Sequence, residues 1–127
     1  MNKNRDIARA YFAAIEAGTL PDDLLADDFT AWTTTQGPLS KELYQGAIPL
    51  LAKLTGGSIR FTVDSITAEA DRVIAEARAT ARLVDGSDYE NTYVFVFRIR
   101  DGRISSIAEH FNALVVIEKL VPLISQA

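Results

Sequence analysis

The amino-acid sequence predicts an α+β domain in which helices cover the inner face of a curved antiparallel sheet. Two amphipathic helical patterns come before Gly57, and a run of alternating strand patterns joined by short polar turns comes after it. Helices followed by hairpin-connected strands pack as a helical layer on a sheet. The chain has 127 residues, 48% of them hydrophobic, which is enough for one core. Residues 1–127 are therefore assigned to one domain.

The first helix is predicted over residues 4–17, where apolar residues recur at helical spacing: Ile7, Tyr11 and Ile15. Gly18 ends this helix. Residues 21–28 can form a short helical turn, and β-branched and aromatic residues then predict a strand over residues 29–33.

A second helix is predicted to begin after Gly46, with a loop over residues 34–38 before it. Pro49 determines this expected start, because proline is tolerated in the first turn of a helix but disrupts a helix interior. The predicted helix presents one apolar stripe and ends at a glycine pair, Gly56 and Gly57; the stripe comprises Ile48, Leu51 and Leu54.

Strands are predicted over residues 59–64, 73–83, 89–100 and 103–112, with the alanine-rich second strand suited to close packing. Residues 113–125 are compatible with either a helix or an extended tail. A curved sheet closed by helices leaves a cavity. Apolar residues on both faces of the third strand indicate that its outer face is also covered, and a homodimer is the simplest cover. The alternative is a monomer whose C-terminal segment covers this face.

Composition excludes several classes of partner and chemistry. The net charge is −4 and there is no block of Lys or Arg, so a nucleic-acid partner is not expected. The chain has no cysteine and one histidine, and its carboxylates lack a ligand spacing, so no metal or nucleotide cofactor is expected. Its N-terminus lacks a long apolar run, so we expect a cytoplasmic protein without membrane segments.

Three segments in this order resemble the SnoaL-like branch of the nuclear transport factor two-like superfamily: residues 25–30, 94–104 and 109–112. The resemblance implies a cone-shaped, cystatin-like α+β barrel with a pocket. It also implies a choice of functions, because that superfamily includes ketosteroid isomerases, limonene epoxide hydrolase, polyketide cyclases and noncatalytic modules.

Some functional residues of the family have a counterpart in this sequence, and others do not. Tyr11 is similar in position to the oxyanion-binding tyrosine of ketosteroid isomerases, but their proton-shuttling aspartate falls near Thr33, and their second oxyanion acid falls near Tyr93. Glu109 matches the pocket acid that polyketide cyclase-like and epoxide hydrolase-like members carry on the final strand. A second acid frequent in the family is replaced by Asn112.

The expected site follows from these matches and from the apolar character of the pocket. Its catalytic candidates are Glu109, Tyr93 and Tyr11, and its substrate-binding candidates are Asn91, Trp32, Phe29 and Phe111. Structural alternatives stay open: Glu109 can pair with an arginine such as Arg78, and the aromatic side chains can simply fill the core.

The face that Glu109 occupies depends on the turn at Asp101–Gly102. A two-residue loop pairs Tyr93 with His110, whereas a three-residue loop with a glycine bulge pairs Tyr93 with Glu109. The resemblance favours the second register, which turns His110 to the outer face. We therefore expect a cofactor-free isomerase, cyclase, lyase or hydrolase for an apolar carbonyl or epoxide compound. The alternative is a noncatalytic small-molecule binding or dimerisation module.

Overall fold

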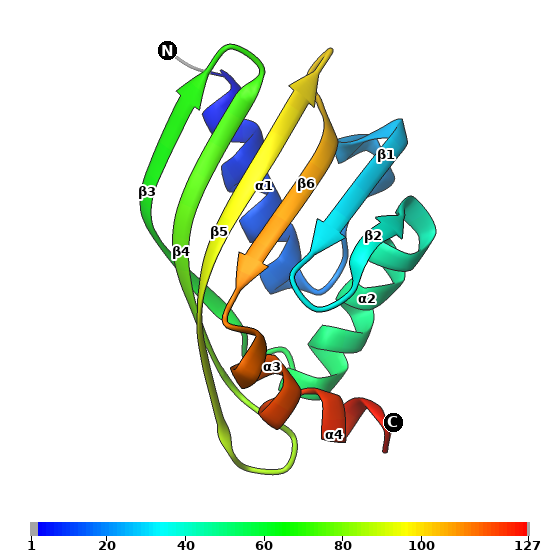
Figure 1. Cartoon of the computed structure of the whole chain (residues 1–127), viewed down its shortest axis with the longest axis vertical. Helices are drawn as coiled ribbons and strands as arrows, with labels where there is room; N and C mark the ends of the chain where they lie inside the picture. Colours follow the sequence, from blue (N-terminus) through cyan, green and yellow to red (C-terminus); the bar gives the residue numbers. More distant parts are fainter. Residues whose placement is uncertain (1–2, 127) are drawn as a thin grey trace.

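The computed structural model describes residues 3–126 and shows a curved six-stranded sheet with strand order β2-β1-β6-β5-β4-β3 (Figure 1). The helices are α1 (Lys3–Ala17), α2 (Lys41–Thr55), α3 (Ala113–Lys119) and α4 (Val121–Ile124), with a short 3-10 turn, η1 (Asp22–Leu24). The strands are β1 (Leu25–Thr33), β2 (Gly37–Ser40), β3 (Arg60–Glu69), β4 (Arg72–Arg82), β5 (Asp88–Arg100) and β6 (Arg103–Phe111).

The helices lie on one side of the sheet. Helix α1 crosses behind the central strands in Figure 1, α2 runs beside β1 and β2, and α3 and α4 lie across the lower end. This arrangement confirms the predicted α+β fold with helices over a curved sheet. One pair differs from the expectation of an antiparallel sheet, because β1 and β6 run parallel and make the sheet mixed.

Helix α2 begins at Lys41, so the predicted start after Gly46 is wrong. The side chain of Ser40 caps the helix by accepting a hydrogen bond from the Leu43 backbone N–H at 3.2 Å. Pro49 lies inside the helix, where it removes one backbone hydrogen bond. Burial of the face that contains Tyr44 outweighs this loss, since that face packs into the core.

Two further segments differ from the sequence-based expectation. Strand β1 begins at Leu25 rather than at Phe29, and the short strand β2, which pairs antiparallel with β1, begins at Gly37 inside the predicted loop. The C-terminal segment, for which helix and tail were both open, forms α3 and α4. The Asn112 side chain caps α3 by accepting from the Leu114 backbone N–H at 3.1 Å.

Aromatic rings form the centre of the core between α1 and the sheet. Phe12 on α1 meets Phe95 on β5 edge-to-face at 5.0 Å between ring centroids, and Tyr11 meets Phe97 in the same way at 5.2 Å. Phe95 and Phe97 are fully buried, as are the small residues on the inner face of β4. The alanines predicted to allow close packing therefore make room for the aromatic rings opposite them.

A bulge near the β5–β6 turn sets the register of the last strand. Asp101 and Gly102 both have positive φ, as the two central residues of a tight hairpin turn require. Ile99 lies opposite Ile104, and beyond this pair the register shifts, which leaves Ser105 as an extra residue on β6.

The bulge decides which side chains of β6 face the helices. Tyr93 lies opposite Phe111, and Phe95 lies opposite Glu109, so both predicted pairings of Tyr93 are wrong. The loop has two residues, yet the side chains of β6 lie on the faces that were expected for the three-residue loop. Glu109 shares the inner face with Tyr93, and His110 lies on the outer face, because the bulge shifts the register by one residue just as a longer loop does.

Candidate functional site

A cavity of about 250 Å³ lies between α2 and the ends of β5 and β6. Its polar lining comes from the sheet, the β1–β2 loop and the start of α2, and comprises Thr33, Thr35, Gln36, Tyr44, Tyr93 and Glu109. Its apolar lining comes from Leu39, from Phe111, from later turns of α2 and from α3 and α4, which close the cavity. A mostly apolar cavity with few polar groups is typical of small-molecule sites.

Glu109 is held by a chain of hydrogen bonds that begins on α1. The Tyr44 hydroxyl donates to Glu109 Oε2 at 2.8 Å, and the Tyr11 and Tyr44 hydroxyls lie 2.5 Å apart. Tyr11 and Tyr44 are both buried. Three elements, α1, α2 and β6, thus position one carboxyl group.

Burial raises the pKa of Glu109 from 4.5 to about 7, and the hydrogen bond from Tyr44 opposes part of this rise. The Glu109 side chain is partly accessible, and it lines the cavity. A carboxyl with this pKa is present in both protonation states near neutral pH, so it can accept and return a proton.

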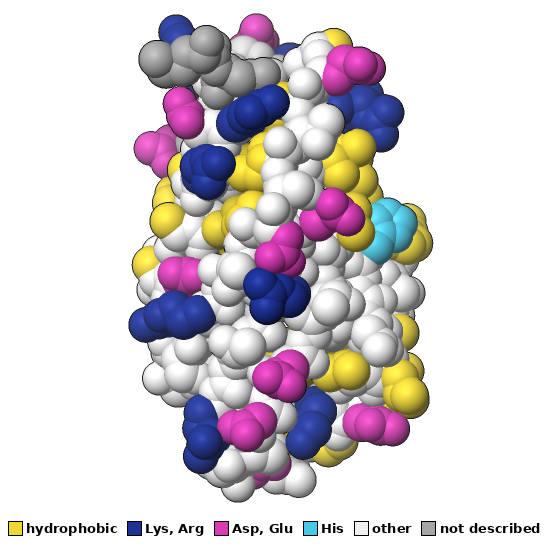
Figure 2. Space-filling model, turned by 90° about the vertical axis from the view of Figure 1, so that its left-hand side faces the viewer, with side chains coloured by type: hydrophobic (Ala, Val, Ile, Leu, Met, Phe, Trp, Pro, Cys, Tyr) yellow, Lys and Arg dark blue, Asp and Glu magenta, His cyan; other side chains and the backbone are white. Residues whose placement is uncertain are grey.

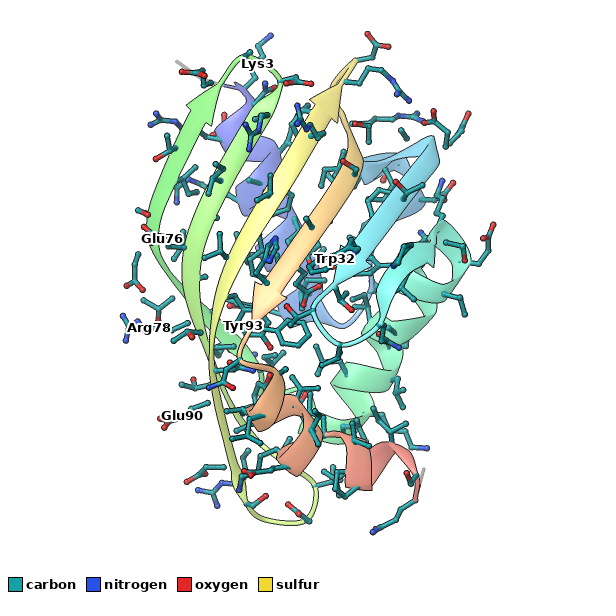
Figure 3. The ribbon with its side chains drawn as sticks, viewed as in Figure 1. Lys3, Trp32, Glu76, Arg78, Glu90 and Tyr93 are labelled. Carbon is teal, nitrogen blue, oxygen red and sulfur yellow. The ribbon has the colours of Figure 1, made fainter. Side chains whose placement is uncertain are left out.

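The structural alternative for Glu109, an ion pair with Arg78, is wrong. Arg78 forms a two-pronged pair with Asp64 at 2.9 and 3.0 Å on the opposite side of the sheet. Figure 3 shows Arg78 and Glu76 projecting outward at the β3–β4 edge, whereas Tyr93 lies near the end of β6. Within the described residues, no basic side chain contributes to the pKa shift of Glu109.

A second hydrogen-bonded group contains Tyr93. Its hydroxyl lies 2.6 Å from that of Tyr89, which accepts from Asn91 Nδ2 at 3.0 Å. Asn91 also bonds both the N–H and the carbonyl of Asn112, at 3.1 and 3.2 Å. Asn91 does not line the cavity. It joins β5 to the start of α3 and so holds the helices that close the cavity.

Besides Asn91, two more of the expected substrate-binding residues lie outside the cavity. Trp32 lies on the outer face, 37% exposed, with its ring 4.9 Å from that of His110, so the expectation that it forms a cavity wall is wrong. Phe29 is buried behind the site and packs against the Tyr44 ring at 5.7 Å, which makes it part of the core. Of the aromatic candidates, Phe111 lines the cavity directly.

Thr33 lies directly beside Glu109, because β1 and β6 pair in parallel with these two residues opposite each other. Its hydroxyl accepts from the Gln36 backbone N–H at 3.1 Å and so shapes the β1–β2 loop at the cavity. The family resemblance implied that the aspartate of ketosteroid isomerases falls near Thr33. The carboxylate lining this cavity is therefore Glu109 alone among residues 3–126.

Tyr44, the residue that donates a hydrogen bond to Glu109, was not among the site residues predicted from the sequence. It lies in a segment that was expected to precede the second helix. A signal for it exists, since Ser40 is a helix-capping residue and Tyr44, Ile48 and Leu51 then follow at helical spacing. The polar residues Thr35 and Gln36 of the short β1–β2 loop were also missed.

Within the described part of the chain, no cluster of His, Asp and Glu has the arrangement of a metal site. No helix among residues 3–126 is long and apolar enough to cross a membrane. Figure 2 shows acidic and basic side chains interspersed on the β3 and β4 side of the molecule. Pairs such as Arg82 with Asp88, at 2.8 Å, lie on this surface.

The fold and the site define a small α+β protein with an apolar pocket and one buried carboxyl at its polar end. Residues 8–107 match the family model of the SnoaL-like domain, and the chain belongs to this family. A comparison with proteins of curated function found no match.

Solved structures with the same fold come from bacteria and a fungus. A proposed isomerase from Bacillus subtilis is 24% identical over 94% of this chain and 95% of that chain, with a TM-score of 0.78. IdmH from Streptomyces antibioticus, proposed to be a polyketide cyclase, is 20% identical over 94% and 99%, with a TM-score of 0.79. PrhC from Penicillium brasilianum is 16% identical over 98% and 89%, with a TM-score of 0.81.

Proposed function

We propose that this protein is a cofactor-free enzyme that uses Glu109 to transfer a proton on a small, mostly apolar carbonyl or epoxide compound. The observation that carries the proposal is a single carboxyl, with its pKa raised to about 7, at the polar end of an apolar cavity. The neighbours proposed to be an isomerase and a polyketide cyclase support the same class of chemistry.

Glu109 as a carboxylate takes the proton from the carbon next to a carbonyl group, or from a water molecule that opens an epoxide. Negative charge then develops on the substrate oxygen. Tyr93 is placed to donate to it: Asn91 donates to Tyr89, Tyr89 can in turn donate to Tyr93, and the hydrogen of Tyr93 is then free for the substrate.

The cavity limits the size of the substrate. Its volume of about 250 Å³ holds roughly eight groups the size of a water molecule or a methylene, at about 30 Å³ each. The aliphatic lining from α2, α3 and α4 fits a hydrocarbon tail, while the oxygenated end faces Glu109. We therefore propose cyclic or branched ketones, enones and epoxides of about this size as the substrate class.

Replacing Glu109 by glutamine is expected to slow turnover about 100-fold or more, because the amide cannot accept the proton. The assay incubates a panel of small ketones, enones and epoxides with the protein in D₂O and follows deuterium incorporation and product formation by NMR. Glu90→Gln, which removes an exposed carboxylate from β5, is the matched control and is expected to keep wild-type rates.

Equal rates for Glu109→Gln and the wild type would contradict the proposal. Binding of panel compounds without any turnover by the wild type would instead favour the alternative, a noncatalytic small-molecule binding protein. The threonine at position 33, in place of an acid, is the observation on which that alternative rests.

We also propose that the protein is a homodimer that pairs through the outer face of the sheet. Apolar side chains form a continuous row across four strands there, because Trp32, Ala108, Val96 and Ile74 lie opposite one another in turn. The row borders a shallow hollow lined by Trp32 and Val96. Exposed apolar patches of this kind on a soluble domain are typical of protein interfaces.

The variant Val96→Lys is expected to convert the protein to a monomer, because it places a charge in the middle of the apolar row. Light scattering coupled to gel filtration should give twice the chain mass of 13.9 kDa for the wild type and 13.9 kDa for the variant. Thr80→Lys, on the exposed side of β4 away from the row, is the control and should stay dimeric. A monomeric wild type would contradict the proposal.

A further inference from the structure

We infer that Tyr44 is a positioning residue that holds Glu109 Oε2, so that Glu109 Oε1 is the oxygen that exchanges a proton with the substrate. This inference rests on the proposed function of the cavity but makes its own prediction about Glu109. Tyr44 acts through the carboxyl group, to which its hydroxyl donates at 2.8 Å.

The direction of the hydrogen-bond chain follows from the number of hydrogens. A tyrosine hydroxyl has one hydrogen, and an ionised carboxylate can only accept. Tyr44 gives its hydrogen to Glu109 Oε2, so in the 2.5 Å contact between the two hydroxyls Tyr11 is the donor. The chain therefore runs from Tyr11 through Tyr44 to Glu109, and each donor strengthens the next.

The other carboxyl oxygen is left for the cavity. Glu109 Oε2 is the atom that Tyr44 holds, and no buried side-chain oxygen or nitrogen among the described residues lacks a partner. Since Oε1 has no hydrogen-bond partner among residues 3–126, that oxygen is accessible, and the open space beside Glu109 is the cavity. A proton taken from the substrate at Oε1 leaves the bond from Tyr44 to Oε2 intact.

Packing holds both tyrosines in place. The Tyr44 ring packs against Phe29, with 5.7 Å between the ring centroids, and the Tyr11 ring packs against Phe97 at 5.2 Å. Both phenylalanines are fully or almost fully buried. The donors are therefore fixed by rigid elements rather than by mobile loops, as an oriented proton-transfer group requires.

The groups that face Glu109 are uncharged at neutral pH. They are Tyr11 from α1, Tyr44 from α2, and Tyr89 and Tyr93 from β5, and burial keeps the pKa of each of these hydroxyls above its usual value. Thr33 lies beside it on β1. The carboxylate thus depends on Tyr44 for its hydrogen bond.

The test is an NMR titration of the ¹³C-labelled Glu carboxyl signals in the protein without ligand. The Glu109 signal is assigned as the one missing from Glu109→Gln. Its midpoint near pH 7 is expected to rise by about one pH unit in Tyr44→Phe, because the ionised form loses a charge-assisted hydrogen bond. Tyr11→Phe removes only the second donor and is expected to give a smaller rise.

Tyr93→Phe is the matched control, since Tyr93 lines the same cavity but bonds Tyr89 instead of Glu109, and it should leave the midpoint unchanged. An unchanged midpoint in Tyr44→Phe would overturn the inference. If Tyr44→Phe does not fold, an unchanged midpoint for Glu109 in Tyr11→Phe would overturn the inference instead. Because the titration needs no substrate, its result is independent of whether any compound is turned over.

Discussion

Replacing Phe97 by alanine is expected to lower the free energy of unfolding by about 3–5 kcal/mol, as for other fully buried phenylalanines. Phe97 is fully buried and has ring contacts with Tyr11, Phe12 and Phe95. Val73, which lies opposite Phe97 on β4, is short and β-branched and cannot turn to fill the space, so most of the cavity created by the substitution remains.

Urea unfolding followed by circular dichroism measures this loss. Phe61→Ala is the matched control, because Phe61 has similar ring contacts but lies half-buried on the edge strand β3, where neighbours and solvent can fill the space. We expect a clearly smaller loss for this control. A loss below about 1 kcal/mol for Phe97→Ala would show that the core is not the packed aromatic cluster described above.

The helices and strands that were predicted correctly are those in which apolar residues recur at the spacing of one buried face. Helix α1 agrees with the predicted range to within one residue at its start, and the odd-numbered residues of β4 from Val73 to Ala79 are buried as the alternation indicated. These predictions succeed because burial of one face is a local property, visible in the spacing of apolar side chains.

The elements that position the site were harder to predict. Because proline disrupts helix interiors, Pro49 led to a predicted start for α2 that was too late and that left Tyr44 outside the helix. In the structure, packing of the buried helix face outweighs the cost of one proline. The parallel pairing that places Thr33 beside Glu109 joins strands far apart in the chain and has no local signal. The bulge at Ser105 likewise depends on how the whole sheet packs.

Some of the site residues were also predicted correctly and others were not. Glu109, Tyr93 and Phe111 line the cavity, and the family resemblance had placed them on one face. Trp32 could not be placed from residue type, because an aromatic residue on a strand is equally suited to a core, a pocket wall or an interface. The structure puts it on the outer face, where our dimer proposal gives it a partner.

Burial of the Glu109 carboxyl is expected to make the protein less stable at higher pH. The pKa of Glu109 is raised to about 7 in the folded protein, whereas in the unfolded chain it returns to about 4.5. Below pH 4.5 both states are protonated and the full stability is present. Between these pH values the unfolded state ionises first, so the free energy of unfolding falls as the pH rises, and above pH 7 this loss is complete.

The loss amounts to about 3 kcal/mol, since one pKa unit corresponds to about 1.4 kcal/mol. Glu109→Gln stays neutral at every pH, so its stability relative to the wild type should increase by this amount between pH 4 and pH 8. Urea unfolding at the two pH values measures the difference. Glu90→Gln controls for the removal of one negative charge, because exposed Glu90 is solvated in both states, and its difference from the wild type should be constant.

A difference that does not grow with pH for Glu109→Gln would mean that the carboxyl is well solvated and ionises at ordinary pH. The expected growth, together with slower turnover, would show that the same burial has two effects. It lowers stability at neutral pH, and it keeps a carboxyl there that can both accept and return a proton. An apolar residue at position 109 would remove the loss of stability at neutral pH, but it could not transfer a proton. We therefore expect that Glu109 lowers the stability of the protein and is required for its activity.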